Sequence, residues 1–315
     1  MTRYVVRRIA LAALILWVVS LAVFLLLRVA GGDPVILQQG MSATPERIAQ
    51  VHRDLNLDDP YYVQYAKWVR HMAVLDLGHS GVTGTKVIDE FRGRLPVSFQ
   101  LMLMTTCWTI LLGIPFGIIS ALKRNSPPDY AVRVFAVFGL SVPAFWVATL
   151  VLMIPAQNWG YAPPLNETTS PFSEPWANIR QMGPPSLVLA LGSMASIMRL
   201  TRSQMLEVLR ADYVRTARAK GLNERVVVIR HALRNSLVPV VTVLGLQVSG
   251  LLGGSVIIES IFNLRGLGQY IFAAILQKDF AVAQSLVMFT ATAAVLSTLV
   301  IDLLYVFLDP RIRYG

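Results

Sequence analysis

The sequence predicts an all-α, polytopic membrane protein with six transmembrane helices, from three observations. Of its 315 residues, 55% are hydrophobic and 15% are charged, and the mean hydropathy is +0.56. A soluble domain usually carries about 25% charged residues. Six stretches lack Asp, Glu, Lys and Arg, and each approaches the length of about 20 residues that crosses a bilayer. The basic residues lie between these stretches, which indicates a membrane surface rather than a nucleic acid as the basic chain's partner.

The six apolar stretches are expected to be helices, because backbone groups in lipid must satisfy one another within the segment. The last is expected to continue past Asp302 to Leu308. In chain order the stretches are Ile9–Leu27, Pro96–Leu122, Val134–Ile154, Gln181–Met198, Asn235–Ile258 and Phe280–Ile301.

The first stretch follows Arg3, Arg7 and Arg8, as the core of a secretory signal peptide would. Its 19 residues exceed the usual 7–15 of such a core. An uncleaved membrane anchor is therefore favoured over a signal peptide.

The distribution of Lys and Arg sets the expected orientation. With the N-terminus inside, the inner segments carry 17 basic and five acidic residues, and the outer segments carry 11 basic and 12 acidic residues. Basic residues concentrate on the cytoplasmic side of membrane proteins. Both termini are therefore expected in the cytoplasm.

This topology divides the chain into three predicted parts. Residues 1–28 form a cytoplasmic tail and the first helix, 29–95 form an extracytoplasmic domain, and 96–315 form a core with helices two to six. The core includes an inner loop, 199–234, that is charged along its length.

The inner loop is expected to fold as two helices, 202–220 and 223–234, that are broken at Gly221. Glycine commonly follows the end of a helix because it adopts the left-handed conformation without strain. Lys220 in the last turn suits the negative end of the helix dipole. Small residues, Ala217 and Ala219 among them, would let another protein approach closely, whereas a loop that only meets lipid headgroups does not need them.

The segment Tyr213–Leu222 (Tyr-Val-Arg-Thr-Ala-Arg-Ala-Lys-Gly-Leu) resembles the cytoplasmic loop of ABC-type import permeases, which carries a Glu-Ala-Ala-x-x-x-Gly pattern. Aligned on Gly221, the two alanines fall on Thr216 and Ala217, and the glutamate falls on Arg215. This departure is similar to the peptide and nickel branch of the family.

Two further stretches carry the same resemblance. Glu259–Gly268 (Glu-Ser-Ile-Phe-Asn-Leu-Arg-Gly-Leu-Gly) resembles the outer segment after the fifth span, with Arg265 where proline is common. Asp309–Tyr314 (Asp-Pro-Arg-Ile-Arg-Tyr) resembles the C-terminal end. Three motifs in order over nearly the whole chain indicate the first permease subunit of a dipeptide, oligopeptide or nickel importer.

The resemblance implies a type I ABC importer permease fold that forms half of a translocation pathway. It implies a second homologous permease subunit, two ATP-binding subunits that use ATP and Mg, an extracytoplasmic substrate-binding protein and a bacterial inner membrane. No cofactor or metal is expected on this chain itself. The solute stays open among dipeptides, oligopeptides, nickel, opines, glutathione and haem.

Three groups of residues are expected to serve these roles. The outer gate or binding-protein contact is assigned to Glu259, Phe262, Gly266 and Gly268, and the translocation path to Gln247, Ser249 and Asp302. For Asp302, a structural partnership with a nearby Arg or backbone group is a standing alternative. Coupling to the ATPase subunits is assigned to Asp212, Tyr213, Arg215, Thr216, Ala217, Ala219, Lys220, Gly221 and Leu222.

Catalysis is not expected. None of the five lysines follows a glycine, so the sequence has no phosphate-binding Gly-x-x-x-x-Gly-Lys-Ser/Thr loop. All four histidines lie outside the predicted spans, and Asp302 is the only acid within one, which argues against an intramembrane protease. A secondary transporter or channel that needs no ATP is the alternative function.

Overall fold

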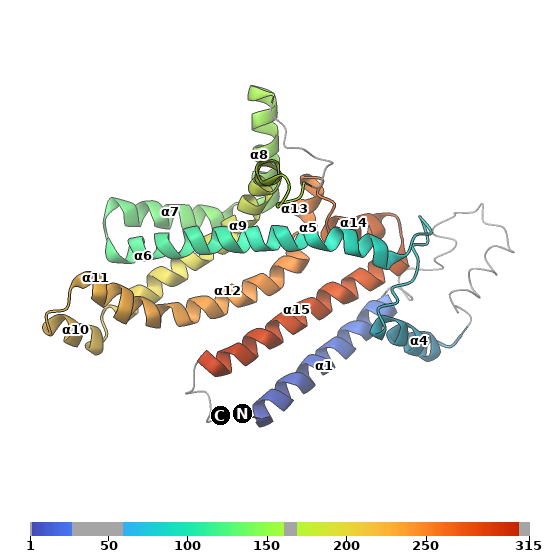
Figure 1. Cartoon of the computed structure of the whole chain (residues 1–315), viewed down its shortest axis with the longest axis horizontal. Coiled ribbons are helices and arrows are strands. Elements are labelled where there is room, and N and C mark those ends of the chain that lie inside the picture. The colour runs from blue at the N-terminus through green and yellow to red at the C-terminus, as the bar shows by residue number, and fades with distance from the viewer. Residues whose placement is uncertain (1, 27–58, 161–168, 309–315) are drawn as a thin grey trace. The chain divides into compact units, whose positions relative to one another are not determined.

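The computed structural model describes residues 2–26, 59–160 and 169–308, and every named element in these ranges is a helix (Figure 1). The elements η3 and η4 are π-helical turns within longer helices. The helices are α1 (Thr2–Leu25), α4 (Tyr61–Ala73), α5 (Val87–Trp108), η3 (Thr109–Gly113), α6 (Ile114–Leu122), α7 (Pro127–Ser141), α8 (Ala144–Trp159), α9 (Pro175–Val208), α10 (Asp212–Ala219), α11 (Glu224–Val226), η4 (Val227–Leu233), α12 (Arg234–Gly254), α13 (Val256–Ile261), α14 (Leu267–Leu276) and α15 (Phe280–Leu308).

Four helical stretches in the described ranges are long and apolar enough to cross a membrane: Val5–Leu25, Val87–Leu122, Glu224–Leu251 and Phe280–Ile301. They overlap the first, second, fifth and sixth predicted stretches, although the fifth helix ends at Gly254 and does not run on to Ile258. A fifth span is reached when α7 and α8 are counted as one broken span. The protein is thus an all-helical, polytopic membrane protein.

The third predicted stretch is not one straight helix. It is divided between α7 and α8, which meet at a bend of 100°. Val142 and Pro143 are extended at this break, with ψ of 128° and 130°. Proline disfavours the helical conformation of the residue before it and offers no backbone N–H to the preceding turn, so the helix ends there.

The fourth predicted stretch lies inside α9, which has 34 residues but is not among the helices apolar enough to span. Its sequence between Gln181 and Met198 contains Gly, Pro and Ser beside the apolar residues. Many of these residues are buried by neighbouring helices, and a helix covered by protein does not need a lipid-compatible surface all round. The composition of α9 therefore does not by itself identify it as a membrane span.

The described chain divides into two compact units, and the first comprises 1–98, 252–260 and 265–299. Its core joins Leu77, Val87 and Phe91 to residues of α14 and α15. Phe91 and Phe289 meet edge to face, with ring centroids 4.5 Å apart. The described part of the predicted outer domain, 59–95, thus packs with helices of this unit, and no separate domain is evident in it. The rest of that predicted domain, 29–58, lies outside the described residues.

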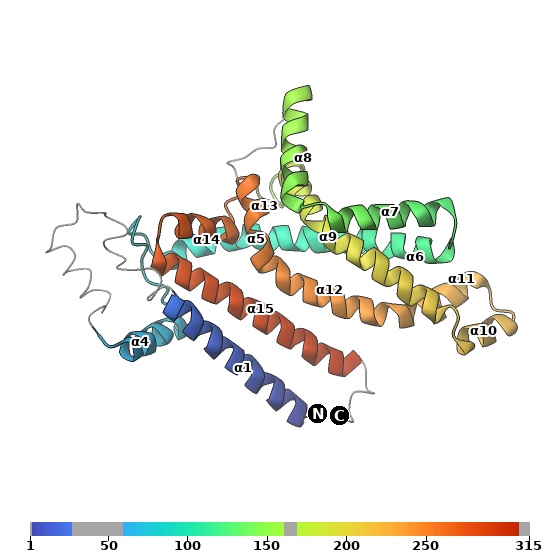
Figure 2. The ribbon, with the colours of Figure 1, turned by 180° about the vertical axis from the view of Figure 1, so that it is seen from behind.

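The second unit comprises 99–251, 261–264 and 300–315 and is organised around α9. Helices α6 and α7 pack along α9, and both views show them side by side (Figure 1, Figure 2). Beyond α9 the chain continues into α10, α11 and η4 and then into α12. This unit therefore carries the predicted inner loop at the end of its longest helix.

Candidate functional site

The predicted inner loop forms a bent helical projection of residues 209–234, called the knob below. Helix α9 ends at Val208, a turn of three residues follows, and α10 runs from Asp212 to Ala219. The expected single helix over 202–220 is therefore wrong. Ala211 is extended, with ψ of 146°, and no Gly or Pro marks this break in the sequence.

The break at Gly221 is confirmed. Gly221 has φ of +77°, and its N–H donates to the carbonyl of Arg218 at 2.9 Å. The N–H of Leu222 donates to the carbonyl of Ala217 at 3.4 Å. These two bonds form a Schellman cap, which satisfies the last carbonyls of α10 and turns the chain into α11.

The interior of the knob is a small apolar core. Val214 and Val227 are fully buried, Ala217 is 6% exposed, and Val208 packs against them. The small size of Ala217 therefore serves packing between α10 and η4. Its predicted role as a surface contact of the ATPase subunit is not supported by this burial.

Polar contacts outside this core hold the turn closed. Arg218 binds the carboxylate of Glu224 through two nitrogens, at 2.7 and 3.1 Å, and its third nitrogen donates to the carbonyl of Leu209 at 3.5 Å. This pairing raises the pKa of Arg218. Asn235 donates to the hydroxyl of Tyr213 at 2.8 Å. Sequence reasoning missed Arg218, Glu224 and Asn235, because their partners meet only after the chain turns.

The predicted coupling residues other than Ala217 lie on the surface of the knob. Arg215 pairs with Asp212 at 2.7 Å, and Thr216 donates to the carbonyl of Asp212 at 2.9 Å. The exposed members of the set are Asp212, Tyr213, Arg215, Thr216, Ala219, Lys220, Gly221 and Leu222.

The same surface carries exposed apolar side chains, of which only Leu222 was among the predicted coupling residues. Leu222 and Val226 are each 41% exposed, and Ile229 is 54% exposed. These residues are spaced four and three positions apart, which places apolar side chains on one face of a helix, and this spacing could be read from the sequence. Exposed apolar side chains rimmed by charges are typical of a protein-binding surface.

The three residues predicted to line the translocation path differ in their hydrogen bonding and in whether the structure describes their side chains. The Oε1 atom of Gln247 is buried and has no hydrogen-bond partner among the described residues. Ser249 is buried, and its hydroxyl donates to the carbonyl of Gly245 in its own helix at 3.3 Å. Residue 302 belongs to α15, but the side chain of Asp302 lies outside the described residues.

The residues predicted to form the outer gate or binding-protein contact are buried within the chain. Glu259 is 0% exposed and Phe262 is 1% exposed, and Gly266 and Gly268 are buried as well. None of these four residues is exposed on the surface of the chain. Their resemblance to the family motif therefore reflects an internal structural element.

Within the first unit, the carboxylate of Glu259 joins three segments. It accepts hydrogen bonds from the hydroxyls of Ser98 at 2.7 Å and Ser255 at 2.8 Å, and from the N–H of Gln269 at 3.0 Å. A Cβ atom at Gly266 would lie 2.4 Å from Oε2 of Glu259, and one at Gly268 would lie 2.7 Å from the backbone of Val256. Both glycines are needed because a side chain would occupy the space of this network.

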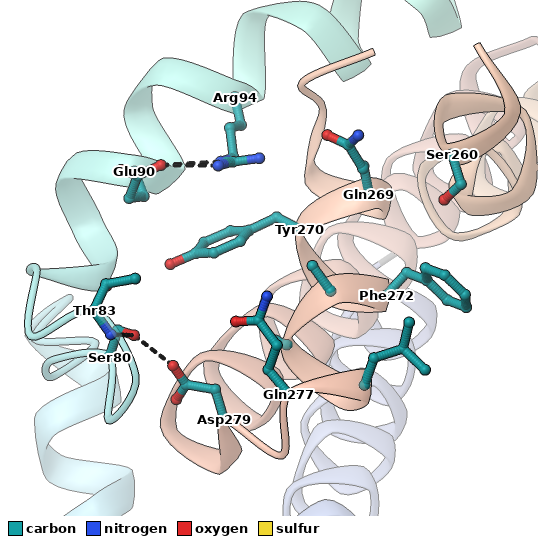
Figure 3. Close-up of a pocket in the computed structure, with 13 residues that line it drawn as sticks. Ser80, Thr83, Glu90, Arg94, Ser260, Gln269, Tyr270, Phe272, Gln277 and Asp279 are labelled. Carbon is teal, nitrogen blue, oxygen red and sulfur yellow. Dashed lines mark hydrogen bonds and ion pairs between the residues drawn. The ribbon is translucent and has the colours of Figure 1, made fainter. Parts of the chain in front are cut away.

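The first unit also contains a cavity of about 530 Å³ beside α14 (Figure 3). Glu90 pairs with Arg94 at 3.0 Å, and Arg94 lies 4.4 Å from the centre of the Tyr270 ring. Burial, followed by the charge of Glu90, raises the pKa of Tyr270. Ser80 donates to Asp279 at 2.5 Å. The hydrogen bond from Ser80 to Asp279 connects the 80–83 loop, which lines the cavity, to the start of α15.

Comparison with known proteins identifies the family. Residues 113–314 match the model of the binding-protein-dependent transport system inner membrane component. Residues 1–102 match the model of the N-terminal part of such membrane components. The two matches together extend over nearly the whole chain.

Several relatives are similar over the full length of the chain. The dipeptide transport system permease protein of Alkalihalophilus pseudofirmus is 38% identical over 333 residues, and the oligopeptide transport system permease protein of Bacillus subtilis is 37% identical over 316 residues. A glutathione transport system permease protein of Salmonella paratyphi A is 36% identical over 314 residues. Each comparison covers 100% of both chains.

A solved structure of an amino acid ABC transporter with histidines has a similar fold. The TM-score is 0.50 at 15% sequence identity, over 71% of this chain and 94% of that chain. The chain is a multi-pass protein of the inner membrane and works with an ATPase and a binding protein. It belongs to the family of binding-protein-dependent transport system inner membrane components and is the non-catalytic permease subunit of an ABC importer.

Proposed function

We propose that this permease imports di- or oligopeptides and that the knob is the point where ATPase subunits drive it. The observation that carries the proposal is the Schellman-capped turn at Gly221, which presents Ala219, Lys220 and Leu222 on an exposed surface. The relatives named as dipeptide, oligopeptide and glutathione permeases support the solute class.

The assembly consists of this chain, a second homologous permease subunit, two ATPase subunits that bind ATP and Mg, and an extracytoplasmic binding protein. The chain crosses the membrane six times in a type I arrangement, with α9 as the fourth span and both termini in the cytoplasm. Residues 29–95 lie outside. The excess of basic residues in 199–234 supports this orientation.

The solute passes beside the fifth span. The buried Oε1 of Gln247, which has no hydrogen-bond partner among the described residues, supports this path, because a buried polar atom without a partner is costly unless water or a ligand satisfies it. Cysteine scanning of α12 with a water-soluble reagent is expected to label position 247. Absence of any accessible position in α12 would contradict this path.

The test is uptake of a labelled dipeptide by proteoliposomes that hold the two permeases and the ATPases, with binding protein outside and ATP inside. Import is expected only when both ATP and binding protein are present. Competition by an unlabelled tripeptide, glutathione or nickel ranks the solutes. Import without ATP would overturn the proposal in favour of a channel or secondary transporter.

A further inference from the structure

A buried carboxylate in the second unit lies close to the knob. Asp129, in the first turn of α7, is 0% exposed. It accepts a hydrogen bond from the hydroxyl of Ser120 at 2.5 Å and from the N–H of Asn125 at 2.9 Å. Nε and Nη2 of Arg202 donate to its two oxygens at 2.8 and 3.0 Å. The carboxylate thus fastens α6, the turn after it and α7 to one position on α9.

The two parallel hydrogen bonds from Arg202 fix the orientation of its guanidinium relative to the Asp129 carboxylate as well as the distance between them. A planar guanidinium that binds both oxygens of a carboxylate allows little rotation or sliding between the helices that carry them. Arg133 also faces Asp129, but its Nε is 3.9 Å away and its side chain is 43% exposed. Arg202 is therefore the partner that joins α9 to α7.

The helices around this pair are in close contact. A Cβ atom at Gly117 would lie 2.6 Å from Cβ of Thr201, and one at Gly139 would lie 3.1 Å from Cβ of Ala195. Backbones that approach this closely cannot slide without collision, because side chains at the contact already touch. Helices α6, α7 and α9 therefore behave as one body at this end.

Arg202 also lies near the end of the helix that carries the knob. Helix α9 ends at Val208, and only a turn of three residues separates it from α10. A displacement of the knob consequently reaches Arg202 through less than two turns of continuous helix.

We infer that Asp129 and Arg202 form a positioning pair that transmits displacement of the knob from α9 to α6 and α7. The pair touches neither solute nor nucleotide, and it acts by keeping three helices in register while the knob moves. This inference rests on the proposed function of the knob as the site where the ATPase subunits act.

The experiment uses the complete importer in proteoliposomes, with labelled dipeptide import and ATP hydrolysis measured in the same sample. Arg202→Lys keeps the charge but removes the paired bonds, and Asp129→Asn removes the charge. Arg133→Lys is the matched control. Both pair variants are expected to assemble and to keep basal ATP hydrolysis within about twofold of the wild type, while dipeptide imported per ATP falls at least about fivefold. The control is expected to retain the wild-type ratio.

The experiment separates a failure of the proposed function from a failure of the positioning role. A wild-type importer without ATP-dependent import would overturn the proposed function itself. Wild-type import together with an unchanged import ratio in Arg202→Lys and Asp129→Asn would overturn only the positioning role. Loss of the assembled complex in both pair variants would also overturn it, because the pair would then be required for folding alone.

Discussion

At the scale of single residues, Gly221 shows what sequence can predict about the knob. A glycine after a helix with a basic last turn indicated a left-handed C-cap, and φ of +77° confirms it. No atom lies within 4 Å of the position where its Cβ would be. The requirement at this site is therefore conformational rather than steric.

Replacing Gly221 by valine is expected to weaken docking of the ATPase subunits. The left-handed conformation costs an L-residue about 1–2 kcal/mol, which corresponds to a roughly 5–30-fold smaller population of the native turn. Co-purification of the ATPase subunits with the permease measures the effect. Gly221→Asn is the matched control, since asparagine tolerates this conformation; equal docking by the valine and asparagine variants would contradict the account.

The motif around Glu259 shows a tertiary contact that the local sequence does not reveal. A charged residue between apolar ones resembles a surface contact in sequence, yet this carboxylate is buried and bound by Ser98 and Ser255. Ser98 is 161 positions away, and nothing near residue 259 in the sequence reveals that partner. Burial of this site is a tertiary property.

Gly266→Ala is expected to lower the stability of the importer by about 1–3 kcal/mol. The added Cβ would meet Glu259 at 2.4 Å and the Ser98 hydroxyl at 2.6 Å. Thermal unfolding of the detergent-solubilised complex measures the loss. Gly93→Ala, inside α5 of the same unit and with open space at its Cβ, should unfold at or slightly above the wild-type temperature, because alanine favours a helix over glycine. Identical curves for both variants would refute the packing argument.

At the scale of helices, composition located most elements but not their interruptions. Apolar stretches marked α1, α12 and α15, because length and hydropathy are local properties. The bend between α7 and α8 has a local cause, Pro143, which a search for stretches without charged residues does not consider. The break at Leu209–Ala211 had none: it follows from packing of Val208 and Val214 in the knob core.

The ion pair between Arg218 and Glu224 is expected to hold the two halves of the knob at a fixed angle. Exposed pairs contribute about 0.2–1 kcal/mol, so Arg218→Glu should weaken binding of the ATPase subunits by at most about fivefold. A binding titration in detergent measures this change. The double variant Arg218→Glu with Glu224→Arg should recover affinity, and no recovery would mean that the pair does not act through its charges.

At the scale of the whole molecule, the proposed six-span topology depends on α9 crossing the membrane. Its composition falls short of a typical span, since much of its surface is covered by α6, α7 and α8. Phe172, 96% exposed, precedes α9, and Leu222 follows it in the knob. The proposed topology places these two positions on opposite sides.

Cysteine labelling tests that placement. The single native cysteine, Cys107, is first replaced by serine, and cysteine is then introduced at Phe172 or at Leu222. A membrane-impermeant maleimide is expected to label position 172 in intact spheroplasts and position 222 only after permeabilisation. Labelling of both positions from the same side would show that α9 does not span.

Photo-cross-linking at Leu222 tests most directly whether the knob receives the ATPase. A photoreactive residue is placed at Leu222 or, as a control, at Phe172, in cells that import dipeptide through the complete importer. We expect a covalent adduct with an ATPase subunit from position 222 and none from position 172. An importer that transports normally yet gives no ATPase adduct from position 222 would contradict it.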